Sequence, residues 1–110
     1  MQIATRQTED RVILDVSGDI DLANSPAMRK TLLGEIKEKR TPKVLLNLRS
    51  VRYIDSSGIA SLVEGLKASR DLGSRLILYG LSPAVREVME LSRLQRIFEI
   101  YDNEEQALAR

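Results

Sequence analysis

The chain contains no cysteine and no histidine among its 110 residues. These two absences exclude disulfide bonds, thiol chemistry, the usual zinc sites and every catalytic triad that relies on histidine. A metal site made of carboxylates alone stays possible. The absence of cysteine also agrees with a cytoplasmic protein, and we expect this chain to be one.

Charge imbalance, aromatic residues and long apolar runs are scarce as well. The 17 basic and 16 acidic residues leave a net charge of +1, which gives no indication of nucleic-acid binding, and aromatic residues make up only 4% of the chain. No apolar stretch approaches the ~20 residues that cross a bilayer. The polar start, MQIATRQTED, lacks a signal-peptide core. We therefore expect a single domain over residues 1–110 that does not insert directly into a membrane.

The most informative stretch is VLLNLRSVRYIDSSGIASLVEG, residues 44–65. Its apolar beginning at residues 44–48 is typical of a strand buried on both faces. A second apolar step follows at Val51, Tyr53 and Ile54. The hydrophobic period then changes from that of a strand to that of a helix, which places a strand-to-helix junction at the centre of the chain.

Four residues with turn and capping chemistry form this junction: Asp55, Ser56, Ser57 and Gly58. We predict that Ser56 is the N-cap and that Ser57 is the first helical residue, with its hydroxyl facing solvent. From spacing alone, a helix cap and a tight turn explain these residues better than a regulated site. The helix is indicated by apolar residues at i, i+3, i+4 and i+7, namely Ile59, Leu62, Val63 and Leu66.

Strands and helices alternate along the rest of the chain. Residues 2–7 and 11–16 predict a β-hairpin that ends at Gly18. Strands joined by single helices require crossovers, so the later strands should be parallel and the fold should be α/β with a small mixed sheet. Two further helices are predicted to begin at Ser-Pro pairs: one at Ser25–Pro26, with Met28, Leu32, Leu33 and Ile36 buried, and one at Ser82–Pro83, with Val85, Val88, Met89 and either Leu91 or Leu94 buried. Two further strands are predicted, at 76–78 after Gly73 and at 97–100. A last helix is predicted to be capped by Asp102 and Asn103.

No residue pattern indicates catalysis. Ser57 has no histidine to activate it and lies in neither a Ser-x-x-Lys nor a Gly-x-Ser-x-Gly motif, so we expect no enzyme activity. Asp19, Asp21 and Asp55 could form a carboxylate cluster for Mg²⁺, although acids in such loops more often cap turns and helices. Glycine-rich phosphate-binding loops are missing.

Small residues recur along one side of the predicted central helix, at Ser57, Ser61, Gly65 and Ala68. Such a row lets another surface approach closely. Two interpretations stay open at this point. Either a neighbouring helix of the same chain covers the row, or a partner protein docks on it with Ser57 at the top of the interface. In the second case a phosphate on Ser57 would place charge in the interface and disrupt it.

Residues 44–100 resemble the STAS domain of bacterial anti-sigma factor antagonists. The matching features are the buried strand, the Asp-Ser-Ser-Gly loop, the helix after it, the following glycine-led strand and the Leu-Ser-Pro-Ala-Val helix start at 81–85. The early Gly-Asp-Ile-Asp at 18–21 resembles the Gly-Glu-Leu-Asp of the family. The resemblance implies a small mixed sheet with helices packed mainly on one side.

The resemblance also implies a mechanism, partner switching. The unphosphorylated antagonist binds an anti-sigma factor, which is a serine kinase of the histidine-kinase-like ATPase superfamily, and thereby frees a sigma factor. The kinase phosphorylates the second hydroxyl residue of the loop, which maps to Ser57, while Asp55, Ser56 and Gly58 complete the phosphorylation loop. Phosphorylation releases the antagonist, and a metal-dependent serine phosphatase resets it. No cofactor and no bound metal are implied.

The chain departs from the family pattern in two places. The loop is usually followed by Gly-Leu-Gly, whereas this chain has Gly58-Ile59-Ala60, and the often acidic segment before the loop carries Arg49 and Arg52. These arginines could pair with a phosphate or suit a different partner. Similar STAS domains also serve as cytosolic accessory subunits of ABC-type lipid transporters without any phosphorylation, and others act in a stress-sensing complex or regulate a phosphatase or a secretion system.

From these patterns we predict a binding module rather than an enzyme, switched by phosphorylation at Ser57. The alternative is the transporter accessory subunit, which would bind its ATPase or permease whatever the state of Ser57. The predicted docking face comprises the loop residues Asp21, Leu22, Ala23 and Asn24 and two residues expected near the surface of the central helix, Ser61 and Gly65.

Overall fold

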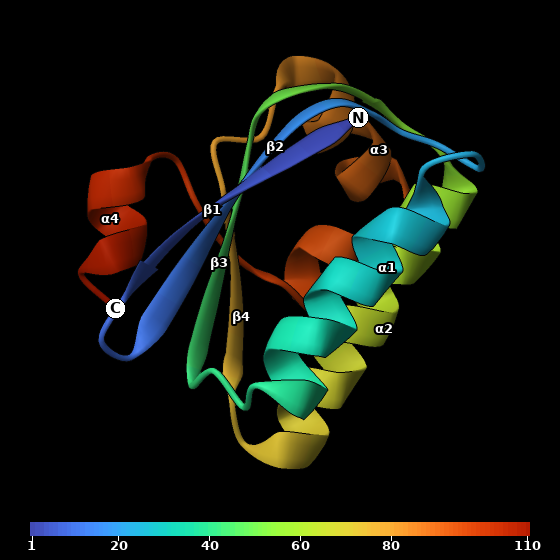
Figure 1. Cartoon of the computed structure of the whole chain (residues 1–110). Helices are drawn as coiled ribbons and strands as arrows, with labels where there is room; N and C mark the ends of the chain where they lie inside the picture. Colours follow the sequence, from blue (N-terminus) through green and yellow to red (C-terminus); the bar gives the residue numbers. More distant parts are fainter.

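The computed structural model describes residues 1–110 as a five-stranded sheet in the order β1-β2-β3-β4-β5 with helices on both sides (Figure 1). None of the helices is both long and apolar enough to cross a bilayer. The strands are β1 (Gln2–Thr8), β2 (Arg11–Ile20), β3 (Lys43–Ile54), β4 (Arg75–Tyr79) and β5 (Glu99–Tyr101). The helices are α1 (Ser25–Leu33), α2 (Ser56–Leu72), α3 (Pro83–Leu91) and α4 (Glu104–Leu108), with a π-helical turn η1 (Gly34–Glu38) after α1 and a 3-10 turn η2 (Leu94–Arg96) after α3.

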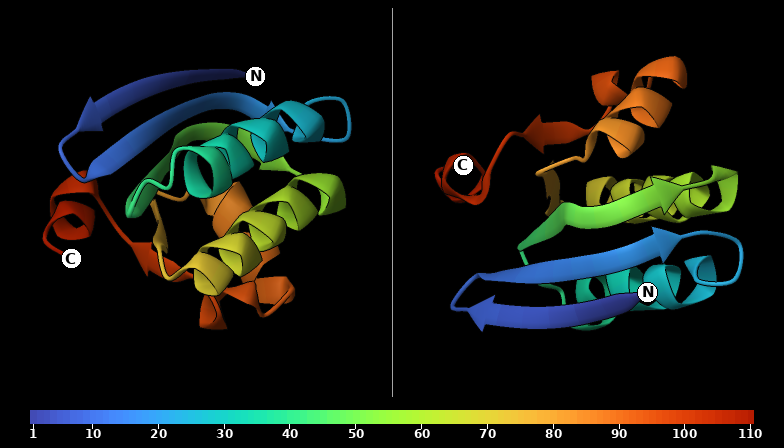
Figure 2. Two further views of the ribbon diagram at one scale, coloured as in Figure 1. Left: turned by 60° about the horizontal axis from the view of Figure 1, so that its bottom comes forward. Right: turned by 90° about the horizontal axis from the view of Figure 1, so that it is seen from above.

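The order of the strands in the sheet follows their order in the chain. β1 and β2 form the predicted antiparallel hairpin, and β2, β3, β4 and β5 run parallel to one another. Right-handed crossovers that always step in the same direction place their helices on the same face of a sheet. Accordingly α1, α2 and α3 lie on one side and α4 on the other (Figure 2). The predicted mixed sheet with helices mainly on one side is confirmed.

The face covered by α1, α2 and α3, called the helix face below, carries the main core. Side chains alternate along a strand, and β3 directs Val44, Leu46 and Leu48 to this face. There they join a cluster of 21 buried apolar residues that also contains Leu62 and Leu66 of α2. The 3.6-residue period therefore identified the buried side of α2, and the apolar run at 44–48 is buried on both faces of the sheet as predicted, with Leu45 on the opposite face.

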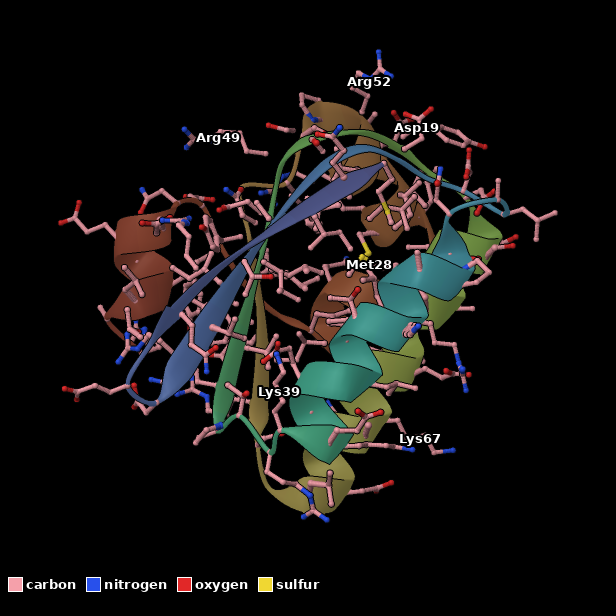
Figure 3. The ribbon with its side chains drawn as sticks, in the orientation of Figure 1. Asp19, Met28, Lys39, Arg49, Arg52 and Lys67 are labelled. Carbon is pink, nitrogen blue, oxygen red and sulfur yellow. The ribbon has the colours of Figure 1, made fainter.

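The predicted apolar stripes of the other two long helices are largely confirmed. Leu33 and Val88 are partly buried against the core, and of the two alternatives at the end of α3, Leu94 packs there while Leu91 is 78% exposed. Figure 3 shows Met28 between α1 and the sheet. The fully buried members of the two stripes are Met28 and Leu32 in α1, Ile36 in η1, and Val85 and Met89 in α3.

The opposite face, called the α4 face below, carries a smaller cluster. Ile13, Leu45, Ile77 and Tyr79 of the three central strands pack around Ala107 of α4. Because α4 has only five residues, it shields the centre of this face and leaves the periphery to polar side chains. The two faces of one sheet are thus covered to very different extents.

A polar network fastens α4 to this face. The Arg6 guanidinium donates to Asp15 Oδ2 at 2.7 Å and to Glu104 Oε1 at 2.6 Å, and the Tyr79 hydroxyl donates to the same Glu104 oxygen at 2.7 Å. The hydrogen bonds from Arg6 hold the pKa values of the Asp15 and Glu104 carboxyls below their usual range. Burial, followed by the hydrogen bond to Glu104, raises the pKa of Tyr79. No sequence pattern had indicated this network.

Three predicted caps are confirmed. Gly73 adopts a φ of 71° at the end of α2, a left-handed conformation that glycine tolerates without strain. Ser82 Oγ accepts a hydrogen bond from Val85 N at 3.4 Å at the start of α3. Of the two residues predicted to cap the last helix, Asn103 is the N-cap of α4 and its Oδ1 accepts a hydrogen bond from Gln106 N at 2.9 Å, whereas Asp102 precedes the cap. Short-range polar chemistry therefore identified these helix ends well.

The last pair of the hairpin is Gln2 with Ser17, so the hairpin ends at Gly18 as predicted, although β2 itself continues to Ile20 through an irregularity at which Gly18 takes a φ of 93°. The two apolar steps at 44–48 and 51–54 lie in one unbroken strand, β3. The predicted N-cap of α1 is wrong. Ser25 is the first helical residue of α1 rather than its N-cap, a position that Asn24 occupies without a side-chain capping bond.

Candidate functional site

The start of α2 is built around Asp55. This residue has extended backbone angles (φ −106°, ψ −173°), and its Oδ1 accepts a hydrogen bond from Gly58 N at 3.0 Å, so that Asp55 is the N-cap. The prediction of Ser56 as the N-cap is therefore wrong. Aspartate and serine cap helices about equally well, and the earlier residue takes the position. Ser56 becomes the first helical residue and Ser57 the second.

Asp55 also ties α2 to the loop between β2 and α1. Its second carboxylate oxygen, Oδ2, accepts a hydrogen bond from Leu22 N at 2.9 Å, and its backbone N–H donates to Ile20 O at 3.3 Å. One carboxylate thus holds the first turn of α2 and the loop at residues 21–24 against each other. The structure brings together two predicted parts of the docking face that lie over thirty positions apart in the sequence.

Gly58 makes this contact possible. A Cβ added at Gly58 would lie 2.2 Å from the carbonyl oxygen of Ile20 and 2.7 Å from Ile54 Cγ1. Both separations are far below van der Waals contact, so any side chain here would force α2 away from the end of β2. The glycine of the Asp-Ser-Ser-Gly loop is required by packing, in addition to any role in turn formation.

The loop at residues 21–24 has an inward and an outward side. Asp21 Oδ1 accepts hydrogen bonds from the backbone N of Asn24 at 3.0 Å and from its side-chain Nδ2 at 2.8 Å. Asn24 Nδ2 also contacts Asp19 O at 3.2 Å, which explains why the Asn24 side chain does not cap α1. Leu22 and Ala23 face outward, and Leu22 is 72% exposed. Asp21 and Asn24 therefore shape the loop, whereas Leu22 and Ala23 form its accessible surface.

Ser57 is half-buried and lines a shallow open cavity of about 460 Å³ between α1 and α2. The two charged residues of this cavity, Arg29 and Glu64, form an ion pair across the two helices. Sequence reasoning missed both residues, although Glu64 lies seven positions after Ser57 and therefore on the same helical face. The complete lining consists of Ser25, Pro26, Arg29, Ser57, Ala60, Ser61 and Glu64.

The row of small residues on α2 packs within the chain. A Cβ added at Gly65 would lie 3.1 Å from Leu32 Cδ1 of α1, and Ala68 is buried. Ser61 is 4% exposed, and its hydroxyl donates to Gly58 O at 2.7 Å. The expectation that Ser61 and Gly65 lie near the surface is therefore wrong, because α1 covers them. Of the two interpretations of the row, the neighbouring helix is correct.

The three candidate metal ligands are held apart by separate partners. Asp19 lies 3.8 Å from Arg52, Asp21 bonds Asn24, and Asp55 bonds backbone groups. The structure contains no cluster of three or more acidic side chains that could hold a metal ion. These acids order the loop and the helix start.

The end of the molecule next to the Ser57 cavity carries exposed apolar and basic groups. Tyr53, in the second apolar step, is 52% exposed. It is paired with Asp19 across β2 and β3, so it lies beside the loop that carries Leu22. Figure 3 shows Arg49 and Arg52 projecting from the same end of β3. The half-buried serine thus lies in the turn that Asp55 ties to the loop carrying the exposed Leu22, a side chain suited to protein contact.

Comparison with known proteins identifies the family. A model of the STAS domain matches residues 2–107. The chain belongs to the STAS domain family. An anti-sigma-B factor antagonist from Listeria monocytogenes is 33% identical over 101 residues, covering 91% of this chain and 86% of the relative. An anti-sigma F factor antagonist from Paenibacillus polymyxa is 27% identical over 108 residues, covering 98% and 92% of the two chains.

Solved structures agree with this assignment. A candidate anti-sigma factor antagonist from Thermotoga maritima has a TM-score of 0.91 at 28% identity, covering 97% of this STAS domain and 92% of that chain. The Bacillus protein SpoIIAA in its phosphorylated form shares the fold, with a TM-score of 0.76 at 22% identity and coverage of 99% and 98%. The predicted membership of the STAS family and the predicted fold are both confirmed.

Proposed function

We propose that this STAS domain is an anti-sigma factor antagonist whose binding to its partner is controlled by phosphorylation of Ser57. The observation that carries the proposal is the double role of Asp55, which accepts hydrogen bonds from both Gly58 N and Leu22 N. These bonds fix the serine-bearing turn beside an exposed loop. The docking surface of the proposal comprises the first turn of α2, Leu22, Ala23 and Tyr53.

The partner we propose is an anti-sigma factor that is itself a serine kinase of the histidine-kinase-like ATPase superfamily. It would transfer the γ-phosphoryl group of ATP to Ser57 Oγ, releasing ADP and the hydroxyl proton. A metal-dependent serine phosphatase would later hydrolyse the phosphate ester. In this scheme the STAS domain is a substrate and a binding module, not an enzyme, and it needs no cofactor. The neutral balance of its charges agrees with a protein partner rather than nucleic acid.

The position of Ser57 determines what a phosphate would do. Negative charge is tolerated in the first turn of a helix, so α2 would keep its structure. The phosphate adds about −1.5 to −2 charges and three acceptor oxygens to the surface. Charge placed in an interface that contains Leu22 and Tyr53 must be desolvated when the partner binds, and this weakens the complex. Phosphorylation therefore releases the partner without unfolding the site.

The relatives support the same assignment. Two of them, described above, are antagonists of anti-sigma factors, and they match this chain over nearly its whole length. SpoIIAA, which shares the fold, exists in a phosphorylated form. Asp55, Ser56, Ser57 and Gly58 supply the residues that the family pattern requires for a phosphorylation loop.

The proposal is tested with Ser57 variants and the purified kinase-type anti-sigma factor from the same cells. We expect Ser57→Asp to weaken binding at least tenfold, or about 1.4 kcal/mol, whereas Ser57→Ala binds normally and is no longer released by ATP. Ser56→Ala is the matched control, because Ser56 is the exposed neighbour in the same turn. Mass spectrometry of the ATP-treated complex should place the phosphate on Ser57. Equal binding by all variants, or tight binding of a transporter ATPase with Ser57 unmodified, would contradict the proposal and favour the accessory-subunit alternative.

A further inference from the structure

The ion pair between Arg29 and Glu64 lies in the same cavity as Ser57. Their side chains are 55% and 49% exposed, and ion pairs at that exposure contribute little to stability. The pair can therefore exchange partners readily. Arg29 and Glu64 are also the only charged residues among the seven that line the cavity, with the Asp55 cap adjacent to it.

The packing of α1 on α2 places Arg29 between Glu64 and Ser57. The two helices run side by side in the same direction (Figures 1 and 2), with Leu32 opposite Gly65. At 1.5 Å per residue, the backbone of Arg29 lies about 3 Å before that of Glu64 along the helix axis and about 7.5 Å beyond that of Ser57. One arginine can thus reach toward either residue.

The direction of helical side chains favours the reach toward Ser57. Cα–Cβ bonds in a helix tilt toward its N-terminus, and Ser57 lies on the N-terminal side of Arg29. A phosphate on Ser57 would therefore offer Arg29 a partner in the direction that its backbone prefers.

We propose that Arg29 is the counterion of phosphorylated Ser57 and leaves Glu64 to bind the phosphate. This inference rests on the proposed phosphorylation of Ser57. A phosphate carries more negative charge than a carboxylate and presents three oxygens, two of which match the planar fork of a guanidinium. Two amides of the first turn, Gly58 N and Ile59 N, already donate to Asp55 and are not available to the phosphate.

The exchange extends the effect of phosphorylation along the groove. Arg29 and Glu64 also line a second open cavity of about 280 Å³, which Lys37 and Lys67 share. Lys67 projects from α2 three residues after Glu64 (Figure 3), a spacing at which the two side chains can pair. When Arg29 breaks its ion pair with Glu64, the Glu64 carboxylate becomes free to pair with Lys67. A phosphate on the first turn of α2 thus rearranges charges two turns away, where a partner can detect the change.

The test uses phosphoserine incorporated genetically at position 57, so that no kinase is involved. The second pKa of the phosphate, near 6 for a free phosphoserine, is followed by ³¹P NMR in the parent sequence and in Arg29→Gln. A cation at the phosphate favours the dianion, so Arg29→Gln should raise this pKa and tighten proton binding about three- to tenfold. Arg29→Lys should fall between the two, because lysine keeps the charge but not the planar fork.

Two further variants separate contact from general electrostatics. Lys30→Gln removes the same charge from the next residue of α1, which lines a different cavity, and should change proton binding by less than half as much. Glu64→Gln removes the competing partner of Arg29 and should lower the phosphate pKa. Equal effects of Arg29→Gln and Lys30→Gln, or no effect of either, would overturn the inference. Arg29 is exposed, so the substitution should leave the fold intact, which thermal unfolding of the unphosphorylated variant checks.

The outcome does not depend on the natural partner. If no kinase modifies Ser57, the proposed function fails while the ³¹P titration still reports whether Arg29 binds a phosphate there. If a kinase modifies Ser57 and releases the domain, but Arg29→Gln leaves the titration unchanged, the proposed function stands and the role of Arg29 fails.

Discussion

The two faces of the sheet are held together in different ways. The helix face buries 21 apolar residues beneath α1, α2 and α3, whereas the α4 face buries five and relies on hydrogen bonds from Arg6 and Tyr79 to Glu104. Apolar burial depends little on pH, while a network of charged groups depends on it directly. The Ser57 site is built entirely from elements that pack on the helix face. The protein therefore places its candidate switch on its most firmly packed side.

The largest difference between the faces should appear at neighbouring positions of β3. Leu46 belongs to the main core and Leu45 to the small cluster, and both are fully buried. We expect Leu46→Ala to lower the free energy of unfolding by about 3–5 kcal/mol and Leu45→Ala by about 2–3 kcal/mol, since α4 can close on the smaller cavity more easily than three packed helices can. Urea denaturation measures both values. A larger loss at Leu45 would mean that the α4 face carries more of the stability than its size indicates.

The next effect concerns the attachment of α4. Glu104→Gln keeps the shape of the side chain but removes the charge that Arg6 binds, and we expect a loss of about 1 kcal/mol. The loss should be local, so that amide hydrogen exchange accelerates in α4 and not in α2. Glu105→Gln is the control, because Glu105 is the exposed next residue of the same helix. Similar exchange rates in both variants would show that the network does not hold α4.

The pH dependence of stability should originate on the α4 face. Asp15 and Glu104 have lowered pKa values in the folded state, so their contribution is complete above the unfolded pKa near 4 and is lost as the pH falls through the folded values. Tyr79 has a raised pKa, so its contribution is complete below about pH 10 and is lost at higher pH. In thermal unfolding across pH, Tyr79→Phe should flatten the alkaline limb and leave the acid limb in place. An unchanged alkaline limb would assign that sensitivity to other groups.

The smallest effects should come from the helix caps on the two faces. Ser82 at the start of α3 accepts from Val85 N and also donates to Val51 O at 2.8 Å, whereas Asn103 at the start of α4 accepts from Gln106 N. We expect Ser82→Ala to lower the free energy of global unfolding by about 1 kcal/mol and Asn103→Ala by about 0.5 kcal/mol. Equal global losses in urea denaturation would indicate that α4 unfolds together with the core rather than before it.

Local chemistry explains which parts of the fold were predictable. The alternation in β2, the apolar run of β3, the 3.6-residue period of α2 and the caps at Ser82 and Asn103 all act over a few residues, so the sequence displays them directly. The choice between Asp55 and Ser56 as N-cap could not be made in this way, because both residue types cap helices well. The backbone angles of Asp55 decide it.

Features that depend on distant contacts escaped sequence reasoning. Burial of Ser61 and Gly65 requires the approach of α1, and only the structure shows which surface covers that row. Arg6 and Glu104 lie 98 positions apart, so no spacing rule could connect them. The candidate serine itself was correctly placed at the start of α2, but its charged neighbours, Arg29 and Glu64, come from two separate helices.

The strand order β1-β2-β3-β4-β5 has a consequence for how the chain assembles during synthesis. Each strand pairs with the strand made just before it, so the sheet can grow at one edge as the chain leaves the ribosome. The contacts that order the Ser57 turn, with Ile20, Leu22 and Ile54, all come from earlier residues. The arrangement around the serine can therefore form before the last strand and α4 have been made, and the nascent chain acquires its candidate switch early in translation.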